Sequence, residues 1–316
     1  MKELVCVVGP TASGKTRLAV DLALRLNGEL VSCDSMQLYA GMAIGTAQPT
    51  EEEKKGVPHH MIGIADPREP WSVGKFAEKA DTVVRDILAR GRLPILAGGT
   101  GLYIEALVSG RSFAPFPRTG RREALEKLAE EEGIETLLCR LREVDPQSAD
   151  RLPPGDRRRI IRALEVWEET GKTITQHNEE TAALPPRYDA AWLGLRFEDR
   201  ADLYARIDRR VDDMMSRGLL SEAQALLAAG IGSDSTAMQA IGYKELLPAL
   251  TCGADPAAAV EKIKQSSRHY AKRQMTWFRR REEIAWITLP REPDPDRVLR
   301  EAIALLELWE GGKRAE

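Results

Sequence analysis

Short apolar runs alternate with stretches of helical periodicity along the first hundred residues. The runs Leu4–Val8, 30–33 and 94–97 have the length and composition of buried strands. Between them, leucines recur every fourth residue over 18–26, and a second amphipathic pattern covers 76–87. Strands that alternate with helices in this way predict a parallel sheet with helices on both faces.

The pattern changes from about residue 113, where a long, strongly helical segment begins. Strand-like runs return only at 191–195 and, less clearly, at 285–289. Between these two runs, and again after the second, the periodicity is mainly helical. We therefore predict an α/β core formed by residues 1–113 and 188–316, with a helical insertion at 114–187.

Composition changes this picture little. Hydrophobic residues make up 43% of the chain and charged residues 30%, with a net charge of −3, as in soluble globular proteins. No apolar run approaches the ~18 residues of a membrane helix, and the first apolar stretch is too short for a signal peptide. The scattered cysteines lack a C-x-x-C pair and favour a reducing compartment. We expect a cytoplasmic monomer with no membrane partner, and we interpret His59 and His60 as a loop turn.

The loop after the first strand carries the clearest chemical motif. Its sequence, GPTASGKT, matches G-x-x-x-x-G-K-[ST] between a strand and a helix. Backbone N–H groups of such a loop converge on an anion, Lys15 adds a positive charge, and the Thr16 hydroxyl is placed for Mg²⁺. The predicted phosphate-binding residues are Gly9, Pro10, Thr11, Ala12, Ser13, Gly14, Lys15 and Thr16. The predicted fold is thus a P-loop parallel sheet flanked by helices, with an inserted helical domain.

Two more strand ends carry polar or glycine-rich loops. Asp34 follows the second predicted strand, and Gly98–Gly99–Thr100–Gly101 follows the third. Because the carboxyl ends of parallel strands share one edge of a sheet, one crevice should gather all three loops. Asp34 could be a general base, a Mg²⁺ ligand or a cap of a turn, and Thr100 could contact a ligand or only cap a helix. The third strand lacks the acid that commonly holds metal in P-loop NTPases, which argues against ATP hydrolysis as the main chemistry.

Basic side chains form clusters on this slightly acidic chain. Three such clusters are RTGRRE, GDRRRIIR and RHYAKRQMTWFRRRE, and the last also contains Trp277 and Phe278. Basic groups contact phosphate backbones and aromatic rings stack on unpaired bases, although any single cluster could be a solvated helix face. Arg206 and Arg210 lie one helical turn apart and could either be solvated or clamp a diphosphate.

Seven motifs together resemble one family, the bacterial tRNA dimethylallyltransferases. In chain order they are GPTASGKT, SCDSMQLYAGMAIGTA, VPHHMIGIADP, AGGTGLYIEAL, RRRIIRALEV, AIGYKEL and AKRQMTWFRRR. The resemblance runs from residue 4 to about 282. Its specific part is the combination of Asp-Ser-x-Gln after the second strand with Gly-Gly-Thr-Gly-Leu-Tyr after the third.

This resemblance implies transfer of a dimethylallyl group from dimethylallyl diphosphate to N6 of an adenosine. The acceptor lies 3′ of the anticodon, at position 37, in tRNAs that read codons beginning with U. The implied cofactor is Mg²⁺, on Thr16, and the implied partner is the tRNA anticodon stem-loop. The implied catalytic residues are Asp34 as general base, Lys15, Thr100 and Arg210, with Arg206 as a further diphosphate contact. The implied tRNA contacts are Asp34, Ser35, Met36, Gln37, Thr100, Arg158, Arg159, Ile160, Ile161, Arg162, Gln239, Gly242, Tyr243, Lys244, Lys272, Arg273, Gln274, Trp277 and Arg279.

Two other classes of function remain open on the residues alone. A small-molecule or nucleoside kinase shares the phosphate-binding loop and a helical insertion, and it would use Asp34 to orient a hydroxyl group. A non-catalytic RNA-binding switch would show nucleotide-dependent affinity for RNA and no modified product.

Overall fold

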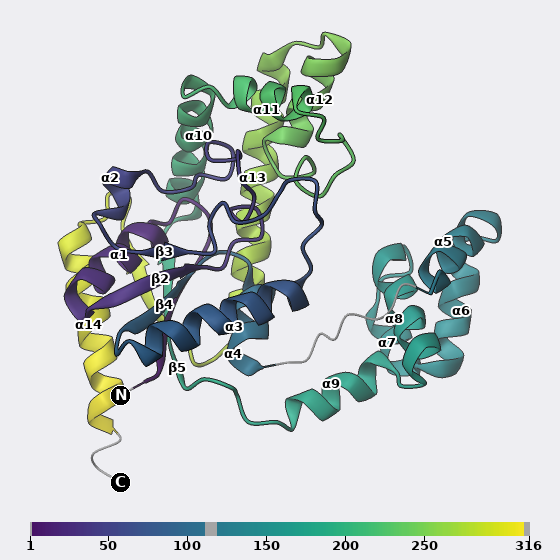
Figure 1. Cartoon of the computed structure of the whole chain (residues 1–316), viewed down its shortest axis with the longest axis horizontal. Coiled ribbons are helices and arrows are strands. Elements are labelled where there is room, and N and C mark those ends of the chain that lie inside the picture. The colour runs from purple at the N-terminus through teal and green to yellow at the C-terminus, as the bar shows by residue number, and fades with distance from the viewer. Residues whose placement is uncertain (1, 111–118, 313–316) are drawn as a thin grey trace. The chain divides into compact units, whose positions relative to one another are not determined.

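The computed structural model describes residues 2–110 and 119–312 and consists of two compact units (Figure 1). The first unit contains Met1–Gly110 and Arg187–Glu316, and the second contains Arg111–Pro186. Our predicted boundary between residues 113 and 114 lies outside the described residues. At the other end of the insertion, Arg187 belongs to the first unit, one residue before the predicted return.

A six-stranded parallel sheet forms the centre of the first unit, in the order β3-β2-β4-β1-β5-β6. The strands are β1 (Leu4–Val8), β2 (Gly28–Ser32), β3 (His59–His60), β4 (Leu93–Ala97), β5 (Ala190–Phe197) and β6 (Ala285–Leu289). The strands predicted from apolar runs are confirmed, with ends shifted by no more than about two residues, as is usual for such predictions. β1 lies between β4 and β5. The carboxyl end of β1 is therefore next to that of β4, which is followed by the glycine-rich loop.

The loop turn predicted at the adjacent histidines is wrong, because these residues form the edge strand β3. His59 pairs with Leu30 and His60 with Val31 in parallel register. The Nε2 atom of His60 lies 2.7 Å from a carboxylate oxygen of the buried Glu29. The same carboxylate accepts hydrogen bonds from both terminal nitrogens of Arg90. This buried ion network holds a strand that is too short to be recognised from periodicity.

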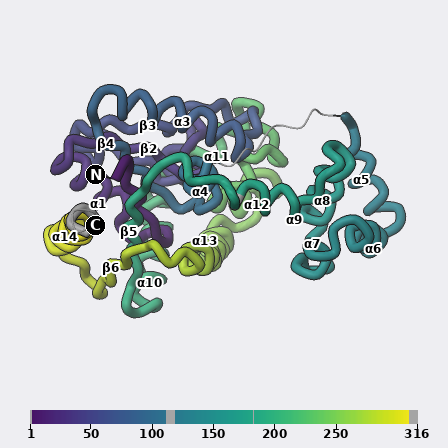
Figure 2. Tube along the Cα trace, turned by 90° about the horizontal axis from the view of Figure 1, so that it is seen from below, coloured from purple at the N-terminus to yellow at the C-terminus, as the bar shows by residue number. Residues whose placement is uncertain are grey.

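Alternating residues of the strands divide the core between the two faces of the sheet. One face packs Val5 and Val7 together with the apolar residues of α1 (Lys15–Leu26) and α14 (Pro295–Gly312). The other face packs Cys6 and the apolar residues of α3 (Val73–Ala89) and α4 (Gly101–Ser109). Figure 2 shows the strands between α3 and α14. The prediction of a sheet covered on both sides is confirmed.

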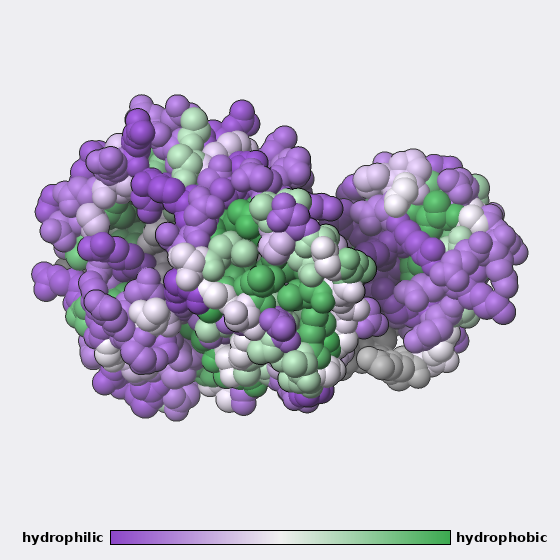
Figure 3. All heavy atoms as spheres, turned by 90° about the horizontal axis from the view of Figure 1, so that it is seen from above, coloured by the Kyte–Doolittle hydropathy of each residue, from purple (hydrophilic) through white to green (hydrophobic). Residues whose placement is uncertain are grey.

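The helices between β5 and β6 pack together beside the sheet, and α11 and α12 lie at one end of the unit (Figure 1). They are α10 (Arg200–Ser216), α11 (Leu219–Ala228), α12 (Tyr243–Cys252) and α13 (Pro256–Phe278); the remaining short helix of this unit is α2 (Glu51–Lys54). α13 packs against α10, α12 and α4. Figure 3 shows an apolar patch within a mainly hydrophilic surface when the molecule is seen from the end where α11 and α12 lie.

The second unit is entirely helical where it is described. Its helices are α5 (Arg121–Glu131), α6 (Ile134–Val144), α7 (Pro146–Arg151), α8 (Arg157–Thr170) and α9 (Ile174–Ala182). It has its own core, which includes Leu137, Leu141 and Leu164. The Asp145 side chain caps α7 and also accepts hydrogen bonds from Thr175 at the start of α9.

The inserted unit leaves and re-enters the first unit at one place. The backbone N–H of Tyr188 donates to the carbonyl of Val108 at 3.2 Å. Beside it, the Arg187 guanidinium donates to the carbonyl of Gly110 at 3.5 Å. Across the described residues, no helix is both long and apolar enough to cross a membrane.

Candidate active site at the carboxyl ends of the strands

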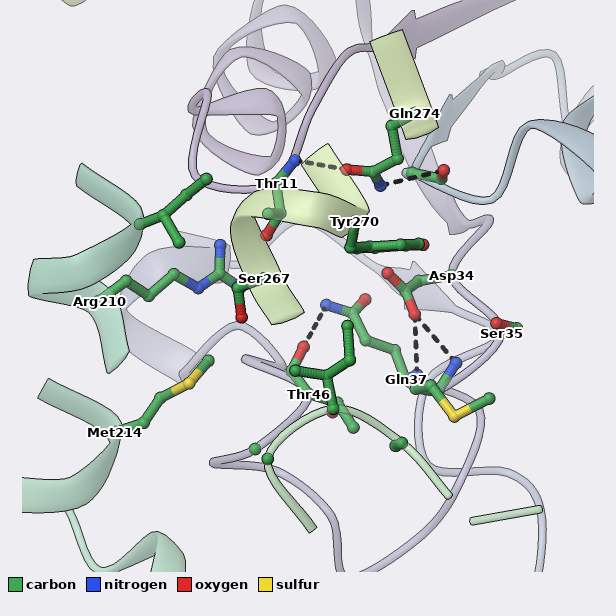
Figure 4. Close-up of a pocket in the computed structure, with 18 of the residues that line it drawn as sticks. Thr11, Asp34, Ser35, Gln37, Thr46, Arg210, Met214, Ser267, Tyr270 and Gln274 are labelled. Atoms are coloured by element: carbon green, nitrogen blue, oxygen red, sulfur yellow. Dashed lines mark hydrogen bonds between the residues drawn. The ribbon is translucent and has the colours of Figure 1, made fainter. Parts of the chain in front are cut away.

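One cavity of about 330 Å³ lies where three strands end, and all three predicted loops line it (Figure 4). Lys15 and Thr16 come from the loop after β1, Asp34 from the loop after β2, and Gly98 and Gly99 from the loop after β4. The expectation that one crevice gathers these loops is confirmed. Residues of α10, α13 and the segment before α12 complete the wall.

The loop after β1 has the conformation of an anion cradle. Ala12 adopts a left-handed conformation, with φ of +62°, and Gly14 follows at +90°. Such left-handed residues turn successive backbone N–H groups toward one point. The Lys15 ammonium donates to the carbonyl of Pro10 at 2.7 Å, and the Ser13 hydroxyl donates to the same oxygen at 2.8 Å. Hydrogen bonds from its own side chains therefore hold the loop.

The charge of Lys15 depends on what enters the cavity. Burial and the neighbouring Arg210 lower the pKa of Lys15 from 10.5 to about 7, and Asp34 partly opposes this. Burial likewise lowers the pKa of Arg210. Two cations in one partly buried place favour the binding of an anion, because the anion relieves their mutual repulsion.

The two arginines of α10 have different surroundings. Arg210 lines the cavity next to Lys15 and Asp34. The Nε of Arg206 instead donates to the carbonyl of Ala12 at 3.2 Å, and its guanidinium lies 5.6 Å from the centre of the Phe197 ring. Arg206 therefore holds the backbone of the loop, and Arg210 is the arginine that faces the main cavity. Both also line a second cavity of about 520 Å³, which shares Lys15 and Thr16 with the first.

Asp34 caps a turn, which is one of the roles that the sequence left open. Its Oδ1 accepts hydrogen bonds from the N–H of Met36 at 2.9 Å and of Gln37 at 3.4 Å, as the cap of a turn does. Among the described residues, every hydrogen bond of Asp34 goes to this oxygen. The turn consequently uses one carboxylate oxygen and leaves the other for the cavity.

Thr100 does not cap a helix through its side chain, although it occupies the N-cap position of α4. Its Oγ1 accepts a hydrogen bond from the N–H of Ser35 at 3.1 Å and donates to the Ser35 hydroxyl at 3.4 Å. The hydroxyl therefore ties the loop after β4 to the loop that carries Asp34.

Gln37 lines the cavity, but its amide group is used within the protein. It donates to the carbonyls of Thr46 and Ala47 at 3.2 and 3.0 Å, and its oxygen accepts from the Ser32 hydroxyl at 2.8 Å. A hydrogen bond from this amide to an adenine edge would require these bonds to break. Gln37 instead holds one of the loops that form the cavity (Figure 4).

Two functional candidates escaped the sequence analysis. Tyr270, on α13, lies beside Asp34 in the cavity (Figure 4), and its hydroxyl interacts with the side chains of Thr100 and Gln274. Burial and the Asp34 carboxylate raise the pKa of Tyr270, so the phenol stays neutral. Glu222, on α11, accepts hydrogen bonds from the N–H groups of Ile44 and Gly45 at 2.8 and 2.9 Å. Tyr270 lies in a segment that stands out for its basic residues, and Glu222 lies in no motif, so helix packing alone reveals both positions.

The predicted tRNA contacts fall into three groups. Lys272, Arg273 and Trp277 are exposed on α13, and Arg279 is exposed directly after it. On α8, Arg158 and Arg159 are exposed, whereas Arg162 is half-buried and bonded to Glu165. The residues that line the cavity are Ser35, Met36, Gln239, Gly242, Lys244, Arg273 and Gln274. Four side chains are buried: Ile160, Ile161, Tyr243 and Gln274.

The predicted tRNA contact is wrong for three of these buried side chains. Ile160 and Ile161 belong to the core of the second unit, because they lie on the apolar face of an amphipathic helix. Tyr243 is 0% exposed, and its hydroxyl donates to Glu222 at 2.6 Å. Gln274 is bonded to the loops of the cavity, so it is unavailable to the outer surface of α13.

The residues present fit a Mg²⁺ ion that binds together with a phosphate group. The Thr16 and Asp34 side chains line the same cavity and offer a hydroxyl and a carboxylate. Within residues 2–110 and 119–312, no group of three or more His, Cys, Asp or Glu side chains could hold a metal alone. Mg²⁺ is usually held by one or two carboxylates together with substrate phosphates, so this sparse set is sufficient.

Comparisons with known proteins agree on one family. A family profile described as IPP transferase matches residues 37–281, and one described as isopentenyl transferase matches residues 2–62. The tRNA dimethylallyltransferase of Caldanaerobacter subterraneus subsp. tengcongensis is 48% identical over 286 residues, which cover 90% of this chain and 91% of the relative.

Solved structures give the same result. The full-length tRNA isopentenylpyrophosphate transferase of Bacillus halodurans is 40% identical, with a TM-score of 0.73; the match covers 99% of this chain and 100% of that one. A eukaryotic dimethylallyltransferase, in crystallographic snapshots of its action on tRNA, is 30% identical with a TM-score of 0.76. That match covers 91% of this chain and 74% of the eukaryotic chain.

Proposed function

This chain belongs to the tRNA dimethylallyltransferase family, and we propose how its residues carry out the reaction. The enzyme transfers a dimethylallyl group to N6 of the adenosine at position 37, 3′ of the anticodon, in tRNAs that read codons beginning with U. The donor is dimethylallyl diphosphate, and diphosphate is released. The observation that carries the proposal is that Lys15 and Thr16 of the anion cradle, the Asp34 carboxylate and the inner face of a basic helix line one cavity.

The cradle after β1 holds the departing diphosphate. When the allylic C–O bond breaks, its electron pair goes to the diphosphate oxygen, and negative charge grows there. Loop N–H groups, Lys15 and Arg210 stabilise this charge most strongly in the transition state, because they are fixed before the reaction. Mg²⁺ bound through Thr16 would neutralise part of the same charge.

Asp34 accepts the proton that the acceptor loses. Adenine N6 is too weak an acid to ionise first, so its proton leaves as the new N–C bond forms, and the carboxylate takes it. The Oδ2 oxygen suits this role because the turn occupies Oδ1. Thr100 holds the loop that carries Asp34 against the loop after β4 through its hydrogen bond with Ser35. Tyr270 offers its ring as a surface on which the adenine base can stack.

Apolar residues give the dimethylallyl group a matching wall. Ile207, Val211 and Met214 of α10 line the cavity next to Arg210, as does Ile263 of α13. A five-carbon chain that leaves water for this wall gains affinity from the apolar surface that it buries. The carbon that reacts is thereby kept between the leaving group and the acceptor.

The acceptor base must leave the anticodon loop to reach this cavity. Extruding a base that is already unpaired costs only a few kcal/mol. The exposed side chains of Lys272, Arg273 and Arg279 would contact the tRNA backbone, with Trp277 available for stacking. Arg158 and Arg159 give the second unit a basic surface for the same stem-loop. The chain supplies every group named here, so we expect a monomer, acting in the cytoplasm where tRNA is found.

Mass analysis of tRNA nucleosides tests the proposal. Purified protein, dimethylallyl diphosphate, Mg²⁺ and unmodified tRNA should yield an adenosine that is heavier by one dimethylallyl group. Dimethylallyl diphosphate should also raise the melting temperature more than Mg-ATP does, because a ligand that binds only the native state stabilises it. Unmodified tRNA together with consumption of ATP would mean that the protein is a kinase.

A further inference from the structure

The helix α13 presents opposite properties on its two faces. Lys272, Arg273 and Trp277 are exposed, while Gln274, in the same turn, is only 4% exposed. A buried amide must find partners for both its donor and its acceptor, since an unpaired polar group in the interior is unfavourable. Besides Tyr270 on its own helix, Gln274 has hydrogen-bond partners in the loops of the cavity.

Gln274 joins two of the three strand-end loops. Its Oε1 accepts a hydrogen bond from the N–H of Thr11 at 2.8 Å, and its Nε2 donates to the carbonyl of Gly99 at 3.0 Å (Figure 4). Both distances are those of well-formed hydrogen bonds. The amide therefore fastens α13 to the anion cradle and to the loop after β4.

The contact with Thr11 reaches Lys15 through a single peptide group. The N–H of Thr11 and the C=O of Pro10 belong to the same rigid plane, and in a trans peptide they point in opposite directions. On one side this plane is held by Gln274, and on the other its oxygen accepts from the Lys15 ammonium at 2.7 Å. If the plane rotates, Lys15 loses its anchor. An ammonium has three N–H donors, so the remaining ones stay available for a phosphate group.

The loop after β4 is shaped around the same amide. A Cβ atom on Gly99 would lie 1.9 Å from Nε2 of Gln274, which is far inside any allowed contact. Gly99 does not have a backbone conformation reserved for glycine, so only this contact requires the absence of a side chain. A change at Gly99 therefore disturbs the amide from the opposite side.

We propose that Gln274 is a positioning residue that links tRNA docking on α13 to the placement of Lys15 in the diphosphate cradle. The proposal rests on the proposed function, because it assigns tRNA to the exposed face of α13 and diphosphate to the loop. A shift of α13 when its outer face binds RNA moves the amide, and the amide moves the peptide that holds Lys15. By thermodynamic linkage, diphosphate must then affect the affinity for RNA by the same factor.

The test measures this factor with inorganic pyrophosphate as the probe. The dissociation constant of pyrophosphate with Mg²⁺ is measured by calorimetry, with and without a saturating anticodon stem-loop RNA. In the unaltered protein we expect the RNA to change this constant about 5-fold or more, which is the lower end of typical coupling. In Gln274→Met, which keeps the length of the side chain but removes the amide, the change should fall to about 2-fold or less.

Two further variants make the outcome decisive. Gly99→Ala should lower the coupling in the same way, and it serves if Gln274→Met fails to fold, as judged by circular dichroism. Lys272→Ala, on the exposed face, should weaken RNA binding and leave the coupling factor unchanged. The proposal is overturned if the unaltered protein shows no coupling, or if folded Gln274→Met and Gly99→Ala keep it. Failure of pyrophosphate or RNA to bind the unaltered protein would instead overturn the proposed function.

Discussion

Replacing Asp34 by Asn separates the two roles of this side chain. Asn keeps an oxygen that can accept from the N–H of Met36, so the turn that now has a 2.9 Å hydrogen bond should survive. The second oxygen becomes an NH₂ group, which cannot accept the proton of adenine N6. We therefore expect Asp34→Asn to bind both substrates normally and to react slowly.

The expected loss follows from the chemistry of proton transfer. A positioned general base contributes about 10²- to 10⁴-fold to the rate, so turnover should fall by at least about 10²-fold, or ~2.7 kcal/mol in the barrier. Single-turnover formation of the modified nucleoside, followed by mass spectrometry, measures the chemical step. Calorimetry with pyrophosphate and with stem-loop RNA measures the two affinities, which should stay within about 3-fold of the original values.

Asp34→Ala is the matched comparison, because it removes the turn as well as the base. Leaving the N–H of Met36 without its partner should lower stability by about 1 kcal/mol, whereas Asp34→Asn should melt close to the unaltered protein. A single-turnover rate for Asp34→Asn within about 5-fold of the original would refute the general-base role. Loss of RNA affinity with the chemical step preserved would make Asp34 a binding residue instead.

Three further predictions concern other parts of the first unit. Hydrogen bonds from Arg90 lower the pKa of the buried Glu29 from 4.5 to about 2. The ionised side chain should therefore contribute about 3 kcal/mol to the free energy of unfolding. This contribution is present above pH 4.5 and is lost as the pH falls through 2. Glu29→Gln should lower the free energy of unfolding in urea by that amount at pH 7, and the difference should shrink below pH 4.5; a constant difference would contradict this. Arg273→Ala should weaken RNA binding and reduce its salt slope by about 1, while Arg85→Ala, on α3, should leave the slope unchanged. Glu222→Gln replaces a carboxylate oxygen by an NH₂ group, which faces a backbone N–H group instead of accepting from it. The variant should therefore melt about 2 °C lower and have a higher KM for RNA in steady-state assays. An unchanged KM would limit Glu222 to a role in stability.

Features with a strong local signal could be predicted from the sequence. β1 is a contiguous apolar run, and the loop after it has a motif whose glycines, lysine and threonine are each required by its geometry. Because strands alternate with helices in the sequence, a parallel sheet is expected, and the carboxyl ends of its strands bring the three loops together. Local pattern was therefore enough for the architecture and for the position of the cavity.

Features that depend on contacts between distant segments could not be predicted. β3 has only two residues and is held by Glu29, which lies far from it in the sequence. On α13, Lys272 and Gln274 belong to one motif, yet they face opposite directions because of the packing against α4 and α10. The same applies to Ile160, whose motif suggested RNA and whose helix face buries it. A motif assigns residues to a site, but the direction of each side chain depends on helix packing.

Hydrogen bonds from Tyr188 to Val108 and from Arg187 to Gly110 bring together the two points at which the chain leaves and re-enters the first unit. Since the chain leaves and re-enters the first unit at nearly the same point, a linker of a few residues could replace the inserted unit. The entropic cost of closing a loop is only slightly larger for a long insertion than for a short one. The helical module is thus free to be enlarged, trimmed or exchanged to suit a different RNA. The prenyl-transfer chemistry would be inherited without change.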